Sequence, residues 1–327
     1  MALLEVRNLS VEFPQRRAVL KALDQVSFSI EAGEILGLVG ESGAGKSLTG
    51  ASIIGLLEPP GRISEGQILL GGARIDDLSP EQMRHVRGKR IGAIFQDPLT
   101  SLNPLLSVGH QLTQTIQAHL PLSAQQAWQR AVQLLQDTGI PAAAERMTHY
   151  PHQFSGGMRQ RVVIALALAA EPELIIADEP TTALDVSIQA QIIRLLRRVC
   201  KERGAAVMLI THDMGVIAET CDRVAVMYAG RLAELGPVQQ VIHQPSHPYT
   251  QGLMRCIPDM SSARDRLHQI DGAMPRLNAI PAGCAFHPRC PQSQSRCTQQ
   301  RPELMAAAGT QAACWLHHTG TEALVSA

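Results

Sequence analysis

The feature that most constrains this chain is a glycine-rich loop between an apolar run and a helical pattern. The apolar run covers residues 35–39 and predicts a buried strand, and the expected helix runs from Ser47 to Leu57. The residues between them match the pattern G-x-x-x-x-G-K-S, which in a strand–loop–helix context predicts a phosphate-binding loop. The matching residues are Gly40, Glu41, Ser42, Gly43, Ala44, Gly45, Lys46 and Ser47.

The chemistry of this loop suits a nucleoside triphosphate with magnesium. Glycines let successive backbone N–H groups point at the β- and γ-phosphates, and the following helix adds its positive end. Lys46 supplies a point charge, and the Ser47 hydroxyl is expected to ligate Mg²⁺. The loop therefore predicts a site for ATP and Mg²⁺.

A second candidate element is an apolar run, residues 174–177, that ends in Asp178 and Glu179. Asp178 is expected to hold the magnesium ion through its water shell. Glu179 is placed to polarise the attacking water as a general base, a role worth about 10²–10⁴-fold in rate. An acidic pair after a strand is weak evidence alone, but beside a phosphate-binding loop it predicts a hydrolytic site.

The remaining pattern predicts an α/β fold. Apolar runs at 91–95, 174–177, 206–210 and 224–228 indicate buried parallel strands, and helical patterns separate the later ones. We expect a P-loop nucleotide-binding domain over residues 1–255, with a helical subdomain inserted at about 98–170. Residues 256–327 are rich in Pro, Cys, His and Gln and predict a small, separate C-terminal extension.

Composition and charge narrow the class of protein. The 29 basic and 29 acidic residues balance, which argues against a dedicated nucleic-acid binder. No apolar run approaches the roughly 18 residues that a membrane span needs, and the N-terminus lacks the pattern of a signal peptide. We therefore expect a cytosolic protein that reaches a membrane only through a partner.

Residues 154–161, with the sequence Phe-Ser-Gly-Gly-Met-Arg-Gln-Arg, resemble the signature motif of the nucleotide-binding subunits of ABC transporters. The resemblance covers about the first 250 residues. It implies that Ser155, Gly156 and Gly157 face the γ-phosphate that is bound by the other subunit of a pair. Met158 replaces the usual glutamine, and the serine and both glycines are intact.

Further residues match family positions in order along the chain. Gln96 resembles the glutamine that contacts Mg²⁺ or the attacking water, and His212 the histidine that contacts the γ-phosphate and holds Glu179. The sequence Ala183-Leu184-Asp185 resembles the loop whose aspartate signals across the dimer. Phe13 occupies the position of the aromatic residue that stacks on adenine, although an aromatic residue in a first strand equally suits the core.

The finer resemblance is to the dipeptide, oligopeptide and nickel importer branch. It rests on residues 94–98, 100–104, 150–153 and 247–250, and on the cysteine-bearing tail. The resemblance implies a second ATPase subunit, two permeases and, indirectly, a solute-binding protein. It also implies a peripheral position on the cytoplasmic face of a bacterial inner membrane. Import of nickel or a metallophore is the alternative, and a soluble ABC ATPase that acts on nucleic acid is less favoured, because the chain has no coiled-coil insertion or second ATPase half.

Four cysteines of the tail have the spacing C-x5-C-x6-C-x16-C: Cys284, Cys290, Cys297 and Cys314. Four thiolates suit a [4Fe–4S] cluster or Zn²⁺. The wide spacing and the Cys290-Pro291 step favour the cluster, zinc is the alternative, and reduced cysteines are the third possibility. The other cysteines, Cys200, Cys221 and Cys256, are expected to be buried thiols.

Overall fold

The apolar runs form the centre of an eight-stranded sheet in the computed structural model, which describes residues 2–16, 18–182, 184–256 and 269–318. The strand order is β11-β12-β10-β9-β3-β8-β7-β6. Strands β9, β3, β8, β7 and β6 are parallel, and every residue of β3 and β8 is buried. This burial confirms the prediction of strands covered on both faces. The five parallel strands are β3 (Ile35–Val39), β6 (Ile91–Ile94), β7 (Leu174–Asp178), β8 (Ala206–Ile210) and β9 (Arg223–Tyr228).

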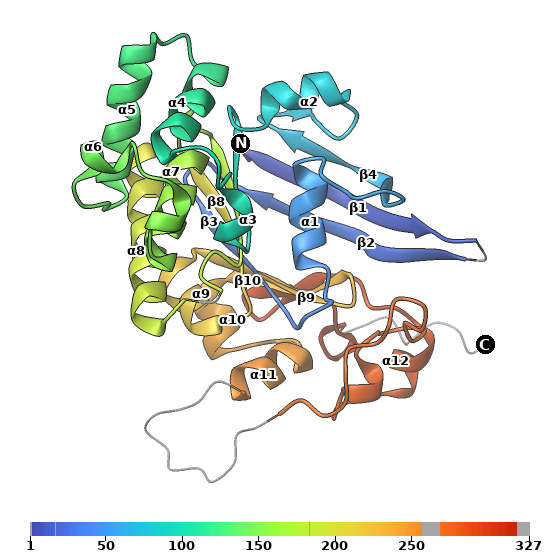
Figure 1. The fold of residues 1–327 in the computed structure, drawn as a ribbon. Coiled ribbons are helices and arrows are strands. Elements are labelled where there is room, and N and C mark those ends of the chain that lie inside the picture. Colours follow the sequence, from blue (N-terminus) through green and yellow to red (C-terminus); the bar gives the residue numbers. More distant parts are fainter. Residues whose placement is uncertain (1, 17, 183, 257–268, 319–327) are drawn as a thin grey trace, which may run out of the picture.

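A second, antiparallel sheet is built largely from the first seventy residues, in the order β2-β1-β4-β5. Leu4 pairs with Ile30 on one side and with Leu70 on the other, and all three side chains are buried. The inner faces of both sheets share one apolar core, which the helix α1 (Lys46–Ile53) joins through Ile53. The strands are β1 (Leu4–Pro14), β2 (Val19–Ile30), β4 (Arg62–Leu70) and β5 (Ala73–Arg74). Figure 1 shows α1 between the two sheets.

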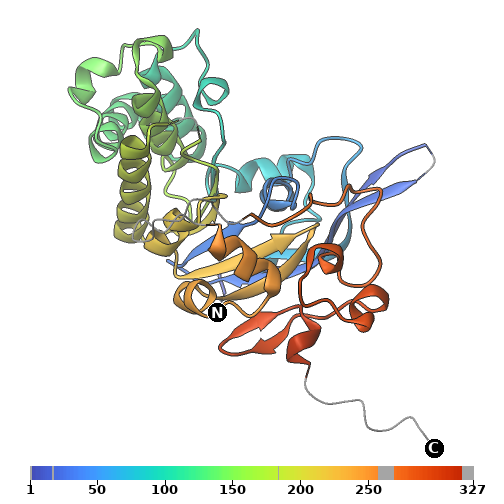
Figure 2. The ribbon, with the colours of Figure 1, turned by 90° about the horizontal axis from the view of Figure 1, so that it is seen from below.

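The predicted helical insertion is present and contains no strand among the described residues. Its helices gather at one end of the molecule, away from the antiparallel sheet (Figure 2). Short polar caps begin several of them; the Ser123 hydroxyl, for example, accepts a hydrogen bond from Gln126 N–H at the start of α5. The helices are α3 (Pro98–Ser101), α4 (Val108–His119), α5 (Ala124–Asp137), α6 (Ala143–Arg146) and α7 (Gly156–Ala167), with a 3₁₀ turn at Pro151–Gln153.

The remaining helices of the ATPase part cover the parallel sheet or lie at its rim. In α8, one apolar face is buried through Ile192, Leu195, Leu196 and Val199. The helices are α2 (Pro80–Val86), α8 (Val186–Arg203), α9 (Met214–Thr220), α10 (Val238–His243) and α11 (Pro248–Arg255).

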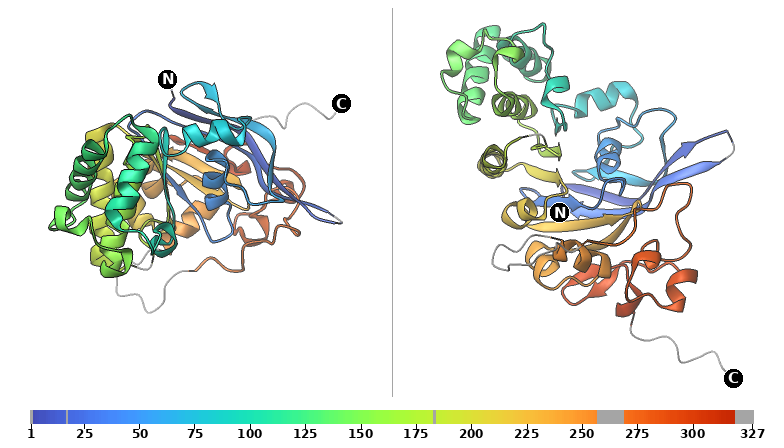
Figure 3. Two further views of the ribbon diagram at one scale, coloured as in Figure 1. Left: turned by 45° about the horizontal axis from the view of Figure 1, so that its top comes forward. Right: turned by 60° about the horizontal axis from the view of Figure 1, so that its bottom comes forward.

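The C-terminal residues extend the main sheet, whereas the sequence predicts a separate module. Strand β12 (Thr310–Ala312) pairs with β11 (Met305–Ala307) on one side and with β10 (Arg231–Pro237) on the other, as Figure 3 shows in red and gold. The main sheet crosses the predicted boundary between the nucleotide-binding domain and the C-terminal extension at residue 255. This boundary stays a prediction. Two 3₁₀ turns, His287–Arg289 and Trp315–His317, and α12 (Ser295–Gln299) complete the part.

A buried carboxylate links the hairpin formed by β11 and β12 to the ATPase part of the chain. Glu234 on β10 is fully buried. Its oxygens accept hydrogen bonds from the backbone N–H groups of Ser246 and His247, at 2.8 and 3.0 Å, and from the Thr310 hydroxyl at 3.0 Å. Because a buried carboxylate is costly unless it is hydrogen-bonded, these donors make the contact specific.

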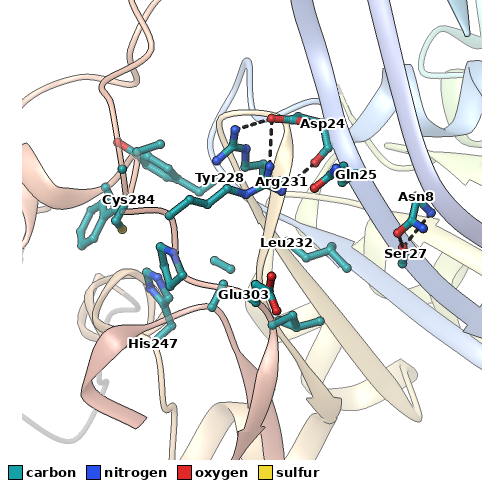
Figure 4. Close-up of a pocket in the computed structure, with 18 residues that line it drawn as sticks. Asn8, Asp24, Gln25, Ser27, Tyr228, Arg231, Leu232, His247, Cys284 and Glu303 are labelled. Atoms are coloured by element: carbon teal, nitrogen blue, oxygen red, sulfur yellow. Dashed lines mark hydrogen bonds and ion pairs between the residues drawn. The ribbon is translucent and has the colours of Figure 1, made fainter. Parts of the chain in front are cut away.

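A cavity of about 510 Å³ lies where the C-terminal part meets β2 and β10. On its wall, Asp24 accepts hydrogen bonds from Arg231, as Figure 4 shows, and from Arg301 at 3.2 Å. Burial raises the pKa of Asp24, but Arg231, Arg301 and Lys21 outweigh it and leave that pKa below its usual value. This ion-pair group is a second link between the N-terminal sheet and the tail.

Candidate active site

The phosphate-binding loop connects β3 to α1, and close packing at two glycines holds it. Gly40 has φ of 152°, and a Cβ there would lie 2.3 Å from the Met227 carbonyl oxygen. Gly45 has φ of 103°, and its Cβ would lie 2.6 Å from Leu23 Cδ2. A side chain at either position would displace the loop, so the tight turn requires glycine.

Lys46 is buried at the first position of α1 and points back into the loop. Its Nζ donates to the carbonyl oxygens of Gly40 at 2.9 Å and Glu41 at 3.1 Å. Burial lowers the pKa of Lys46, while the nearby carboxylates, foremost Glu179 and Asp178, partly restore it. A desolvated ammonium attracts phosphate oxygens more strongly than an exposed one, because less water screens it.

Ser47 and Asp178 lie together although 131 residues separate them. The Ser47 hydroxyl donates to Asp178 Oδ1 at 3.0 Å. Burial raises the pKa of Asp178, and Glu179 adds to the increase, while Ser47 and Lys46 oppose it. A hydroxyl and a carboxylate are the hard oxygen ligands that Mg²⁺ takes, so this pair fits the ion. Magnesium, when bound with ATP, supplies positive charge against the phosphate oxygens.

Glu179 stands at the centre of the site with a constrained backbone. Its φ of 46° is left-handed, which is uncommon for a side-chain-bearing residue and is found most often at functional sites. Its Oε2 accepts hydrogen bonds from Gln96 Nε2 at 3.2 Å and from the Thr182 hydroxyl at 2.9 Å. His212 Nδ1 lies 3.4 Å from its Oε1. The carboxylate is thus oriented from three sides.

These groups line one open pocket of about 720 Å³. The predicted residues that it brings together come from strand β1, the loop and helix start, and the ends of β6, β7 and β8: Phe13, Ser42, Gly43, Gly45, Lys46, Ser47, Gln96, Glu179 and His212. Asp178 adjoins it through Ser47. The roles assigned to these residues in ATP binding and hydrolysis stay predictions.

The signature residues do not line this pocket. Ser155 caps α7, where its hydroxyl accepts from Met158 N–H at 3.4 Å, and Ser155 and Gly156 are exposed. A Cβ at Gly157 would lie 2.8 Å from Ile188 Cγ2, so this helix start packs on α8 next to the exposed Asp185. Ala183, the first residue of the predicted signalling loop, lies outside the described residues. One chain therefore presents the signature outward, away from its own pocket.

Several residues of the site, among them Thr182 beside Glu179, are missing from the sequence predictions. Leu277 lines the same pocket as Phe13. The Tyr249 hydroxyl accepts a hydrogen bond from Glu41 N–H at 2.9 Å, and Arg289 Nη1 lies 3.1 Å from both carboxylate oxygens of Glu41. The sequence around Tyr249 stands out as a marker of the importer branch, but nothing in the sequence near Leu277 or Arg289 signals a nucleotide contact.

The structure does not support the predicted metal centre in the tail. Among the described residues, no group of three or more His, Cys, Asp or Glu side chains is arranged to hold a metal ion. Cys284, Cys290, Cys297 and Cys314 are free thiols, although they lie near enough for charges to interact in every pair. Burial raises the pKa of Cys314 to about 11, which favours the thiol over the thiolate that a metal needs.

The other cysteines are thiols as expected: Cys200 and Cys221 are buried, and Cys256 is partly buried. Burial raises the pKa of Cys200 to about 12, so this thiol stays protonated.

No helix in the described part of the chain is both long and apolar enough to cross a membrane.

Comparisons with known proteins identify the family of the chain. Residues 23–182 match the ABC transporter family, and residues 233–297 match the family described as oligopeptide/dipeptide transporter, C-terminal region. The dipeptide transport ATP-binding protein DppD of Escherichia coli is 45% identical over 96% of both chains. The oligopeptide transport ATP-binding protein AppD of Bacillus subtilis is 44% identical over 96% of this chain and 97% of its own.

Solved structures share the fold of the ATPase part. The dimeric cassette MJ0796 in a post-hydrolysis state with ADP and phosphate gives a TM-score of 0.65 at 28% identity, covering 72% of this chain and 98% of its own. CbiO1 of Clostridium perfringens, part of the transporter complex cbiONQ, gives a TM-score of 0.65 at 30% identity, covering 74% and 91%.

Fold and site together define an ABC-type ATPase, in which the phosphate-binding loop and the carboxylate of Glu179 line one pocket and Asp178 adjoins it through Ser47. Within that class, the chain belongs to the family of ATP-binding subunits of dipeptide and oligopeptide ABC transporters.

Proposed function

We propose that this chain hydrolyses ATP to drive uptake of dipeptides or oligopeptides across a bacterial inner membrane. The observation that carries the mechanism is the position of Glu179 over Lys46 and Ser47, in a pocket that lacks the signature residues. The names of the relatives, which include dipeptide and oligopeptide transport proteins, support the substrate class.

In the proposed cycle, Lys46 and the loop N–H groups hold the triphosphate. Glu179 accepts a proton from the attacking water, and Gln96 and His212 keep its carboxylate aimed at that water. The signature residues of a second ATPase subunit, which correspond to Ser155, Gly156 and Gly157 of this chain, complete the site from outside. A lone subunit should therefore bind ATP but hydrolyse it slowly, because half of each site is missing.

A groove near Gln96 is the proposed contact with a permease. It has a volume of about 340 Å³ and is lined by Ala93, Phe95, Thr100, Ser101, Val163 and Leu166. Phe95 and Leu99 beside it are large apolar side chains that are 46% and 61% exposed. Exposed apolar groups at a rim mark interaction sites. A permease segment seated here would link motion around Gln96 to the membrane subunits, and would hold the chain peripherally on the cytoplasmic face.

Transport by a reconstituted complex tests this proposal. We expect ATP-dependent uptake of a labelled dipeptide or oligopeptide into vesicles that contain this chain, a second ATPase subunit and two permeases, supplied with the solute-binding protein. Uptake of nickel or a metallophore without peptide uptake would contradict the substrate class. Hydrolysis at full rate by this subunit alone would contradict the shared site.

A [4Fe–4S] cluster or Zn²⁺ at Cys284, Cys290, Cys297 and Cys314 is a separate prediction, and the ATPase cycle does not depend on it. Its support is the closeness of the four thiols. Binding would require them to converge further and to lose their protons. Iron and zinc analysis of anaerobically purified protein, with its visible spectrum, tests it: iron with visible absorption indicates the cluster, and colourless protein without either metal removes the prediction.

A further inference from the structure

Residues 269–283, which precede the first cysteine of the tail, pass beside the nucleotide pocket. Figure 2 shows this orange segment close to α1 before it reaches α12. Leu277, near its middle, lines the pocket with Phe13, Ala22 and the loop residues. Residues more than two hundred positions apart in the chain thus line one pocket.

The position of Leu277 is fixed by neighbouring residues of the same segment that pack against the protein, because the Leu277 side chain itself is not buried. Ile270 packs over Gly252 of α11, where a Cβ would lie 3.0 Å from Ile270 Cδ1, and Met274 and Ile280 pack against the core. Between the last two, Ala279 N–H donates to the Arg276 carbonyl at 2.8 Å and closes a turn. Leu277 itself stays 38% exposed on this turn, so its apolar surface is free to meet a ligand.

Arg289 fastens the same segment to the phosphate-binding loop. Its side chain is only 7% exposed, and Nη1 lies 3.1 Å from both carboxylate oxygens of Glu41. Its Nε donates to the Asp271 carbonyl at 2.8 Å, and Nη2 to the Ile270 carbonyl at 3.3 Å. One guanidinium therefore spans the start of the segment and the second residue of the loop, and such a buried charge is stable only with these partners.

Tyr249 holds Glu41 from the other side. Its hydroxyl accepts from Glu41 N–H at 2.9 Å, and its backbone N–H donates to His247 Nδ1 at 3.0 Å. Burial lowers the pKa of His247 to about 4, so the ring is neutral near pH 7 and its Nδ1 is available as an acceptor. Tyr249 thus holds the backbone of Glu41, and Arg289 holds its side chain. Both residues come after the five parallel strands in the sequence.

We propose that residues 269–289 complete the ATP pocket, with Leu277 contacting the nucleobase and Arg289 positioning the phosphate-binding loop through Glu41. Phe13 and Leu277 supply the apolar surfaces that a flat adenine ring requires. Arg289 touches no substrate; it acts by fixing the backbone whose N–H groups meet the phosphates. The inference rests on the nucleotide site described under the proposed function.

Binding of ATP and of inorganic tripolyphosphate distinguishes the nucleobase contact of Leu277 from the positioning role of Arg289. Binding of ATP and of inorganic tripolyphosphate, each with Mg²⁺, is measured by calorimetry on the full-length chain. Leu277→Ala should weaken ATP binding by about three- to tenfold, from the lost apolar contact, and leave tripolyphosphate binding unchanged. Arg289→Gln should weaken both ligands by the same factor, about tenfold, because the loop itself is displaced. Arg289→Lys, which keeps the charge but not the paired donors, should fall between.

Leu105→Ala is the matched control, since Leu105 is 82% exposed and does not line the pocket; it should change neither affinity. Unchanged ATP binding by a folded Leu277→Ala variant would overturn the nucleobase contact. Unchanged binding by Arg289→Gln and Arg289→Lys would overturn the positioning role, as would weakening of ATP alone. Failure of the wild-type chain to bind ATP would instead refute the nucleotide site.

Discussion

Replacing Glu179 by Gln is expected to lower the rate of ATP hydrolysis by about 10²–10⁴-fold while ATP affinity stays close to wild type. The amide keeps the shape of the side chain but cannot accept the proton of the attacking water. Lys46, Ser47 and the loop N–H groups remain to hold the nucleotide. Turnover by the assembled transporter and ATP binding by calorimetry measure the two effects separately.

The matched control is Glu81→Gln, because Glu81 lies exposed on α2, and its charged partners in the described part of the chain are Arg84 and His85. This variant should hydrolyse ATP at the wild-type rate. With Glu179→Gln, ATP should also trap the two ATPase subunits in a closed pair, visible by size-exclusion chromatography. Brisk turnover by Glu179→Gln would show that another group takes the proton.

Replacing Lys46 by Ala should weaken ATP binding by about 10–100-fold, since a hydrogen bond to a charged group contributes about 1.5–3 kcal/mol. Lys46 donates to the loop carbonyls of Gly40 and Glu41, and its loss removes a positive charge that offsets the carboxylates of Asp178 and Glu179 near the phosphates. Hydrolysis and transport should fall with binding. Equilibrium titration with ATP and Mg²⁺ gives the change in affinity.

Lys201→Ala serves as the control for Lys46→Ala, because Lys201 is exposed in the last turn of α8 and does not line the pocket. Its ATP affinity should equal that of the wild type. An affinity within twofold of wild type for a folded Lys46→Ala variant would contradict the assigned role of this lysine.

Much of the site could be predicted from the sequence because its chemistry depends on local spacing. The loop from Gly40 to Ser47 needs a strand before it and a helix after it, and both are visible as apolar patterns. The expected helix is longer than α1, which ends at Ile53. The pairing of Ser47 with Asp178 follows from the fold class, since the carboxyl ends of parallel strands meet at one edge of a sheet.

The contribution of the tail could not be predicted in this way. Leu277 lies in an irregular segment without periodicity, and its place over the pocket depends on distant anchors such as Ile270 on Gly252. Arg289 is one of many arginines, and only the fold brings it to Glu41. The cysteine spacing suggests a metal, but spacing alone does not fix how closely four thiols approach.

The burial of Glu234 beneath the C-terminal hairpin bears on how far the chain tolerates shortening. Deleting the residues beyond α11 would remove Thr310 from this carboxylate and strip β10 of its outer neighbour. An uncovered strand edge pairs readily with another chain. We therefore expect a fragment trimmed to the generic cassette to aggregate more readily than the full chain, because the seven residues of β10 would replace the three residues of β11 as the edge of the sheet.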